Sequence, residues 1–85
     1  MKRVDGEPRS DYDLELDNLI LDLLDEKNAL SPYKIKEILN KRYSRKLGWI
    51  TIKRHLDWLM EKKIVALFYE SEDENKKLRL YMLSK

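Results

Sequence analysis

The sequence contains no cysteine and no glutamine, and it has only two glycines, two prolines and one histidine. Without cysteine the chain can form neither a disulfide framework nor a thiolate metal site or nucleophile. One histidine without cysteine also excludes a structural zinc site. No apolar run approaches the roughly 18 residues of a membrane span, so we expect a cytoplasmic or nucleoid-associated protein. The lack of glutamine, with abundant Lys, Glu, Leu and Ile, is a weak sign of a thermophilic source.

The charges are unevenly distributed along the 85 residues, although the net charge is only +2. Asp11 to Asn28 contains seven acidic residues against one lysine, whereas Ser31 to Lys63 contains ten basic residues against three acidic ones. Such a basic segment favours a surface that faces a polyanion more strongly than the total charge does. The alternative is that the acidic and basic segments neutralise each other across an internal contact.

The first half of the sequence predicts two helices. From Asp11 to Glu26, apolar residues recur at helical spacing, and acidic residues occupy the first turns, where the helix dipole favours anions. A second helix starts at "LSPYKI", because Ser31 is a good N-cap and Pro32 suits the first helical position. Its apolar stripe continues to about Tyr43.

A third helix is predicted from Trp49 to about Lys62, with Gly48 as its N-cap. Helical spacing places Ile52, Leu56 and Leu59 on its buried face, flanked by Trp49 and Met60. The residues that then face outward are Ile50, Thr51, Arg54, Asp57 and Trp58.

After Lys63 the pattern changes from helical to alternating. "IVALFYE" and "LRLYMLS" are rich in branched and aromatic residues, and the polar "SEDENKK" separates them, so we expect a β-hairpin. Residues 1–10 are expected to be a loose arm and residues 11–85 a single domain. The predicted class is α+β, mostly α: three helices followed by a C-terminal hairpin.

The segment "TIKRHLDWLMEKKIV" resembles the winged-helix family, whose recognition segment reads Thr-hydrophobic-x-Arg-His-Leu-x-x-Leu and runs into the first wing strand. "KLRLYMLS" is similar to that family's return strand, and the resemblance covers roughly Asp13 to Ser84. It implies a helix-turn-helix in the second and third helices, with the third helix in the major groove and the hairpin as a wing on the flanking backbone. Winged helices also serve as protein-docking modules.

The resemblance implies that Thr51, Arg54 and Ile50 contact bases and that Lys53 contacts a phosphate. Arg54 can pair with N7 and O6 of guanine, and Thr51 can contact a base edge or a thymine methyl. The alternative is a merely solvated helix face. Further expected phosphate contacts are Tyr33, Lys34, Lys36, Arg45 and Lys46, assisted by free amides at the helix start after Ser31. Expected wing contacts are Lys76, Lys77 and Arg79.

Two features depart from the winged-helix pattern. Lys63 stands where the family usually has a left-handed glycine, so we expect some steric cost at the end of the third helix. The wing tip is acidic at Glu72, Asp73 and Glu74, which phosphates would repel. We therefore expect the tip to point away from a duplex or to be mobile.

No enzyme signature appears in the sequence, so we expect neither catalysis nor a cofactor or metal. Asp11, Asp13, Glu15 and Asp17 alternate like a calcium loop, but the required glycine is missing and apolar residues lie between them. His55 lies near the edge of the buried stripe without a triad-like carboxylate and nucleophile. We expect it to be partly buried and to bond the backbone.

Leu14 and Leu21 form a second apolar line on the first helix, about 100° or more from its core centre. We expect this line to bury against a second copy, which would present two recognition helices to half-sites about 34 Å apart. The expected function is sequence-specific binding of double-stranded DNA by a small transcriptional regulator, without a small-molecule ligand. The alternative is a protein-docking module that uses Trp58 and the hairpin aromatics.

Overall fold

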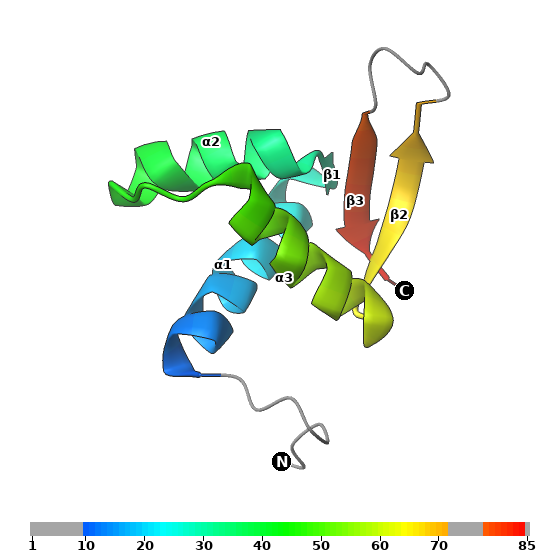
Figure 1. Cartoon of the computed structure of the whole chain (residues 1–85). Helices are drawn as coiled ribbons and strands as arrows, with labels where there is room; N and C mark the ends of the chain where they lie inside the picture. Colours follow the sequence, from blue (N-terminus) through cyan, green and yellow to red (C-terminus); the bar gives the residue numbers. More distant parts are fainter. Residues whose placement is uncertain (1–9, 72–77, 85) are drawn as a thin grey trace.

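The computed structural model describes residues 10–71 and 78–84 (Figure 1). The elements, in chain order, are α1 (Asp11–Lys27), β1 (Ala29–Leu30), α2 (Pro32–Tyr43), α3 (Trp49–Glu61), β2 (Val65–Glu70) and β3 (Arg79–Leu83). The three predicted helices and the hairpin strands are therefore confirmed. Apart from Ser10, the predicted N-terminal arm lies outside the described residues, as does the acidic wing tip.

Polar caps determine where the first two helices begin. Ser10 and Asp13 form a capping box at the start of α1, in which the Asp13 amide donates to Ser10 Oγ at 3.1 Å. The predicted cap of α2 is confirmed, because the Lys34 amide donates to Ser31 Oγ at 3.1 Å and Pro32 occupies the first helical position. Both helices thus start where their side chains satisfy exposed amides.

The turn between α2 and α3 is held by one side chain, that of Asn40. Its Nδ2 donates to the Leu47 carbonyl at 3.0 Å, and its Oδ1 accepts from the Leu47 amide at 2.7 Å. Ser44 ends α2 in the left-handed conformation, with φ 55°. The predicted N-cap Gly48 then begins α3 without a side-chain hydrogen bond. These contacts set the angle between the two helices.

Lys63 adopts the left-handed conformation expected of a glycine, with φ 64°. Its amide donates to the Met60 carbonyl and the Ile64 amide donates to the Leu59 carbonyl, both at 2.9 Å. This pair of bonds is a Schellman motif, which satisfies the last carbonyls of α3 and turns the chain into β2. The expected strained helix end is therefore present.

The sheet has three strands in the order β1-β3-β2, and β1 was not predicted. Its register pairs Ala29 with Met82 and Leu30 with Tyr81. Two residues are too few to show an alternating pattern, and the strand exists only because β3 lies beside it. Strands β2 and β3 pair antiparallel, with an irregularity at Phe68 between Leu67 and Tyr69.

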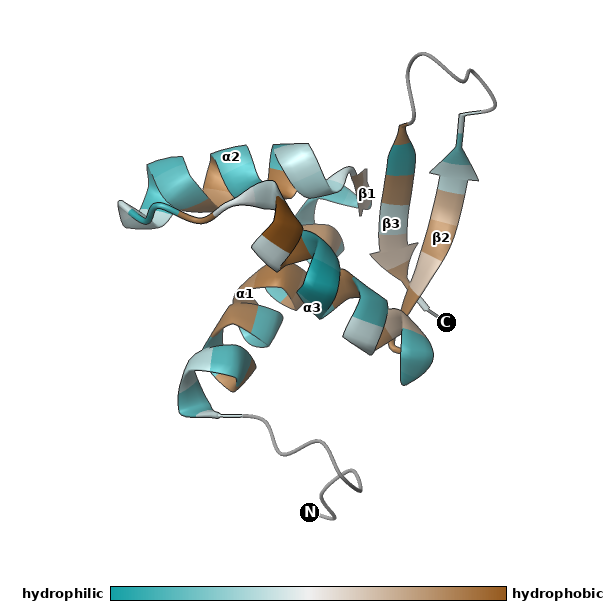
Figure 2. Ribbon diagram, viewed as in Figure 1, coloured by the Kyte–Doolittle hydropathy of each residue, from teal (hydrophilic) through white to brown (hydrophobic). Residues whose placement is uncertain are grey.

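One core fills the space between the helices and the sheet. Figure 2 shows both hydrophobic and hydrophilic segments along each helix, as amphipathic packing requires. The buried apolar residues are Leu16, Ile20, Leu23, Leu24, Ile35, Leu39, Ile52, Leu56, Leu59, Val65 and Tyr81. The predicted buried face of α3 is thus confirmed. Within the part of the chain that the structure describes, no helix is both long and apolar enough to cross a membrane.

Two tryptophans depart from their predicted places on α3. Trp49 was expected to flank the core, but it lies in the first turn of α3 and is 49% exposed. Trp58 was expected to face outward, yet it packs partly against the core. Helical spacing gives the direction of a side chain but not which neighbours cover it.

His55 joins α3 to α1 through contacts with acidic side chains. It is 6% exposed, and its Nδ1 lies 2.6 Å from Oδ1 of Asp17, which is itself 4% exposed. Its Nε2 lies 3.6 Å from Oδ1 of Asp13. His55 is therefore more deeply buried than the sequence led us to expect, and its ring pairs with the carboxylate of Asp17. Asp13 and Asp17 stand four residues apart, so that both carboxylates lie on the α1 face turned to α3.

Candidate nucleic-acid interface

The first residues of α3 present an open face to solvent. Ile50 is 55% exposed, Arg54 is exposed and Thr51 is half-buried. All three predicted base-contacting residues therefore lie on the accessible part of this helix, with Thr51 the most covered. Among the residues that the structure describes, Arg54 makes no ion pair. Its guanidinium charge is consequently available to an outside partner.

Lys53 lies on the side of α3 that faces the hairpin. Its Nζ is 3.1 Å from Oδ2 of Asp57, one helical turn further along, and the two side chains are 36% and 55% exposed. Exposed pairs of this kind contribute about 0–1 kcal/mol, so Lys53 can exchange Asp57 for a phosphate. The predicted phosphate contact therefore competes with an intramolecular pair.

The start of α2 carries three of the predicted phosphate contacts. Tyr33 and Lys34 are exposed, Lys36 Nζ lies 4.2 Å from the centre of the Tyr33 ring, and Lys34 Nζ lies 3.8 Å from Oε1 of Glu37. The helix start has fewer free amides than expected, because Pro32 has no N–H and Ser31 accepts from the Lys34 amide. An anion here would depend mainly on the side chains.

Arg45 and Lys46 differ in their surroundings although they are neighbours in sequence. Arg45 turns to α1, where its guanidinium lies 3.2 Å from Oε2 of Glu15 and 5.9 Å from the centre of the Tyr12 ring. Lys46 is exposed and, within the described ranges, forms no ion pair. Lys46 is thus the better placed of the two for an external phosphate.

The acidic α1 neutralises part of the basic segment. Besides the Arg45 pair, Arg42 binds Glu26 with nitrogen–oxygen distances of 3.2 and 3.4 Å. The Arg42 hydrogen bond and charge lower the pKa of the Glu26 carboxyl below 4.5. Internal neutralisation therefore accounts for part of the charge pattern, because α1 offsets Arg42 and Arg45. Among the described residues, Arg54 and Lys46 have no such ion pair.

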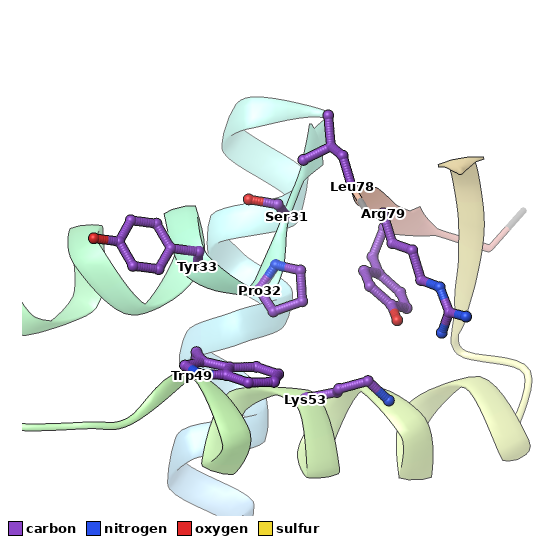
Figure 3. Close-up of a pocket in the computed structure, with 8 residues that line it drawn as sticks. Ser31, Pro32, Tyr33, Trp49, Lys53, Leu78 and Arg79 are labelled. Atoms are coloured by element: carbon purple, nitrogen blue, oxygen red, sulfur yellow. The ribbon is translucent and has the colours of Figure 1, made fainter. Parts of the chain in front are cut away.

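A groove with a volume of about 560 Å³ lies between the start of α2, the start of α3 and the hairpin (Figure 3). We call it the α3–hairpin groove. Its lining residues come from three segments: Ser31, Pro32 and Tyr33 at the start of α2, Trp49 and Lys53 of α3, and Leu78, Arg79 and Tyr81 of the hairpin. The sequence did not predict a pocket, because the groove joins segments that are far apart along the chain.

The groove combines aromatic walls with two cations. In Figure 3 the Trp49 ring lies below Pro32, and the cationic ends of Lys53 and Arg79 lie toward the strands. Arg79 Nε donates to Oε2 of Glu70 at 3.0 Å. Hydrogen bonding to Tyr81 and then to Glu70 raises the pKa of Arg79 above its ordinary value. Of the predicted wing contacts, Arg79 faces this groove, and Lys76 and Lys77 lie outside the described residues.

The two leucines of the predicted dimer surface are not equivalent. Leu14 is exposed beside the exposed Tyr12, whereas Leu21 is half-buried and packs against the chain's own core. The apolar surface that α1 offers to a partner is therefore concentrated in its first turns. Within residues 10–71 and 78–84, no group of three or more His, Asp or Glu side chains is placed to hold a metal ion.

No family model matches the chain, and no curated protein matches it either. A solved structure of HOP2, described as giving "structural insights into the DNA recognition and protein interaction domains" of that protein, has the same architecture with a TM-score of 0.62. The match covers 80% of this chain and 97% of that chain. The fold is a winged helix. At 20% sequence identity the likeness extends to the fold alone.

Proposed function

We propose that this winged helix binds double-stranded DNA in a sequence-specific manner and acts as a small transcriptional regulator. The observation that carries the proposal is the open face of α3, where Arg54 is exposed and unpaired within the described part of the chain. A helix of this kind fits the major groove, and an unpaired guanidinium there can bind N7 and O6 of guanine. Ile50 and Thr51 would contact neighbouring base edges.

Phosphate contacts on either side would orient α3 in the groove. Lys46 precedes α3 and is open, while Tyr33, Lys34 and Lys36 project from the start of α2. Contacts of this type fix the register of a protein on DNA but carry no sequence information. Arg79, on the hairpin, would reach the backbone beside the α3–hairpin groove.

The structural likeness to the DNA recognition and protein interaction domains of HOP2 supports nucleic-acid or protein binding as the class of activity. The role in transcription, the cytoplasmic location and the absence of catalysis are parts of our proposal. So is a homodimer through the start of α1. It would supply a second recognition helix, since one such helix reads few base pairs.

Selection from random duplexes, followed by titration of the selected site, tests the proposal. We expect the parent chain to prefer one sequence, and Arg54→Ala to lower its affinity for that site about 5- to 100-fold while relaxing preference at one base pair. Lys62→Ala, at the opposite end of α3, serves as a charge-matched control and should leave base preference unchanged. Equal losses on every sequence for Arg54→Ala would make Arg54 a phosphate contact.

A second candidate function is protein docking, and one observation favours it. Leu67, Phe68 and Tyr69 are exposed on β2, which lies at an edge of the sheet. An edge strand with apolar side chains can pair with an extended segment of another protein. Trp58, the other predicted docking residue, packs partly against the core instead. A parent chain that binds no duplex at low salt would favour docking over DNA binding.

A further inference from the structure

We infer that the α3–hairpin groove holds one unpaired nucleotide of a DNA strand, with its base against the Trp49 indole and its phosphate at Lys53 and Arg79. This inference rests on the proposed DNA binding. It assigns a ligand to the α3–hairpin groove, which contacts with paired bases would leave empty. Duplex DNA keeps its bases stacked inside, so a paired nucleotide cannot place its base in a groove beside α3.

The size and walls of the groove suit a flat aromatic ligand. Its volume of about 560 Å³ falls within the range of roughly 300–1,000 Å³ that is usual for pockets of small organic molecules. The indole of Trp49 is half exposed, and the Pro32 and Tyr81 rings also line the groove. Aromatic side chains beside a basic rim are the combination by which proteins stack and hold unpaired bases.

The charges at the rim favour a nucleotide with a single phosphate over a polyphosphate. Lys53 pairs with Asp57 at 3.1 Å and Arg79 pairs with Glu70 at 3.0 Å, so the two cations are matched by two carboxylates. The two carboxylates would repel a polyphosphate, because two cations are too few to neutralise several phosphate groups as well. One phosphodiester can displace both weak surface pairs, while the base supplies apolar contact with the walls.

The position of the groove points to a nucleotide within a DNA strand. Trp49 and Lys53 lie on the hairpin side of α3, one turn apart, and Ile50 and Arg54 follow each of them on the adjoining face of the helix. A protein with Arg54 in the major groove would therefore bring the α3–hairpin groove next to the same duplex. An unpaired nucleotide at the end of that duplex could enter it without displacing α3.

The test compares a blunt duplex, the same duplex with a short single-stranded thymidine extension, and free thymidine monophosphate. We expect the parent chain to bind the extended duplex about 5-fold or more tightly than the blunt one, the factor that corresponds to one stacked base. Trp49→Leu should remove this preference and leave binding of the blunt duplex unchanged. Tyr43→Leu is the matched control, because Tyr43 is also an exposed aromatic residue, at the far end of α2, and should change neither affinity.

Fluorescence locates the nucleotide without removing the ring. Trp58→Phe leaves Trp49 as the single tryptophan, since the chain has two. Its emission should be quenched by the extended duplex and much less by the blunt duplex or the free nucleotide. Equal quenching by the free nucleotide would overturn the assignment to DNA and make the ligand a small molecule.

The outcomes separate this inference from the proposed function. If the parent binds the blunt duplex but gains nothing from the extension, the inference is wrong and the DNA-binding proposal stands. If the parent binds neither duplex, both fall. A preference for the extension that survives in folded Trp49→Leu, or emission of Trp49 that the extended duplex leaves unquenched, also overturns the inference.

Discussion

Nδ1 of His55 and Oδ1 of Asp17 lie 2.6 Å apart in the interior, where one hydrogen bond joins the proposed recognition helix to α1. An ionised carboxylate can only accept a hydrogen bond, and in that form of the pair the Nδ1–H of the imidazole is the donor. Because both side chains are buried, this contact ties α3 to α1 from inside the core. The other face of the same helix carries Ile50 and Arg54, so a buried contact positions the proposed DNA-binding surface.

Removing either partner of this pair should destabilise the fold. We expect His55→Ala or Asp17→Ala to lower the free energy of unfolding by about 3 kcal/mol, because each removes a hydrogen bond between two buried polar groups. The double variant should cost less than the sum of the two single variants. Urea unfolding measures all three. Asp57→Ala, on the exposed face of α3, is the control and should change stability by no more than about 0.5 kcal/mol.

A serine at position 48 should stabilise the chain. Gly48 caps α3 in an extended conformation with φ −94°, forms no side-chain hydrogen bond, and has no atom within 4 Å of the position that a Cβ would occupy. Gly48→Ser supplies the missing cap and should add a few tenths of a kcal/mol to the stability, or about 1–3 °C in Tm. Gly48→Ala lacks the hydroxyl. Comparing it with Gly48→Ser therefore separates the effect of the cap hydrogen bond from the effect of the lower backbone entropy of the unfolded chain. A lower Tm for the serine variant would contradict the cap geometry.

The salt dependence of DNA binding should distinguish two neighbouring bases. Lys46→Ala should weaken cognate and random duplexes alike and reduce the magnitude of the salt slope by about one unit, because it removes one phosphate contact. Arg45→Ala should change the slope less, because Glu15 already offsets the Arg45 charge. Titrations between roughly 50 and 200 mM salt cover the sensitive range. Equal changes of slope for the two variants would show that Arg45 leaves Glu15 when DNA binds.

The ion pair between α1 and α2 should be visible in a pH titration. Arg42 holds the pKa of the Glu26 carboxyl below 4.5, so Arg42→Ala should raise that pKa toward 4.5. A lowered folded-state pKa means that the stabilisation is present above pH 4.5 and is lost as the pH falls through the folded value. NMR of the Glu26 carboxyl measures the shift.

The oligomeric state tests the proposed dimer. We expect the parent chain to sediment as a dimer at micromolar concentration and Leu14→Lys to sediment as a monomer, because the exposed apolar surface of α1 lies around Leu14. Leu67→Lys, on the exposed edge strand, should leave the dimer intact. A monomeric parent, or a dimer disrupted by the Leu67 variant alone, would show that α1 is not the interface.

Local signals in the sequence predicted the helices and the strained turn after them. Ser31 with Pro32, and Lys63 at the glycine position, each act within a few residues, so their effects follow from the sequence pattern. The contacts that were missed join distant segments. Asp17 meets His55 across 38 positions, and β1 is a strand only because Met82 lies opposite Ala29.

The candidate site likewise has features that local sequence patterns predicted and features that depend on contacts between distant segments. The direction of Arg54 and Ile50 follows from helical periodicity, and the structure places both on the open face of α3. The α3–hairpin groove and the Arg45–Glu15 pair depend on how α1, α2 and the hairpin pack, which periodicity does not encode. Which positive charges remain available is therefore a property of the tertiary structure.

The strand order β1-β3-β2 has a consequence during synthesis of the chain. Both β1 and β2 pair with β3, so neither has a strand partner until residues 79–83 have left the ribosome. Until then Val65 and the apolar faces of α1 and α3 lack the cover of Tyr81, a ring buried in the finished core. The last-made element of the sheet is its middle strand, so its arrival covers the core and pairs both edge strands in one step.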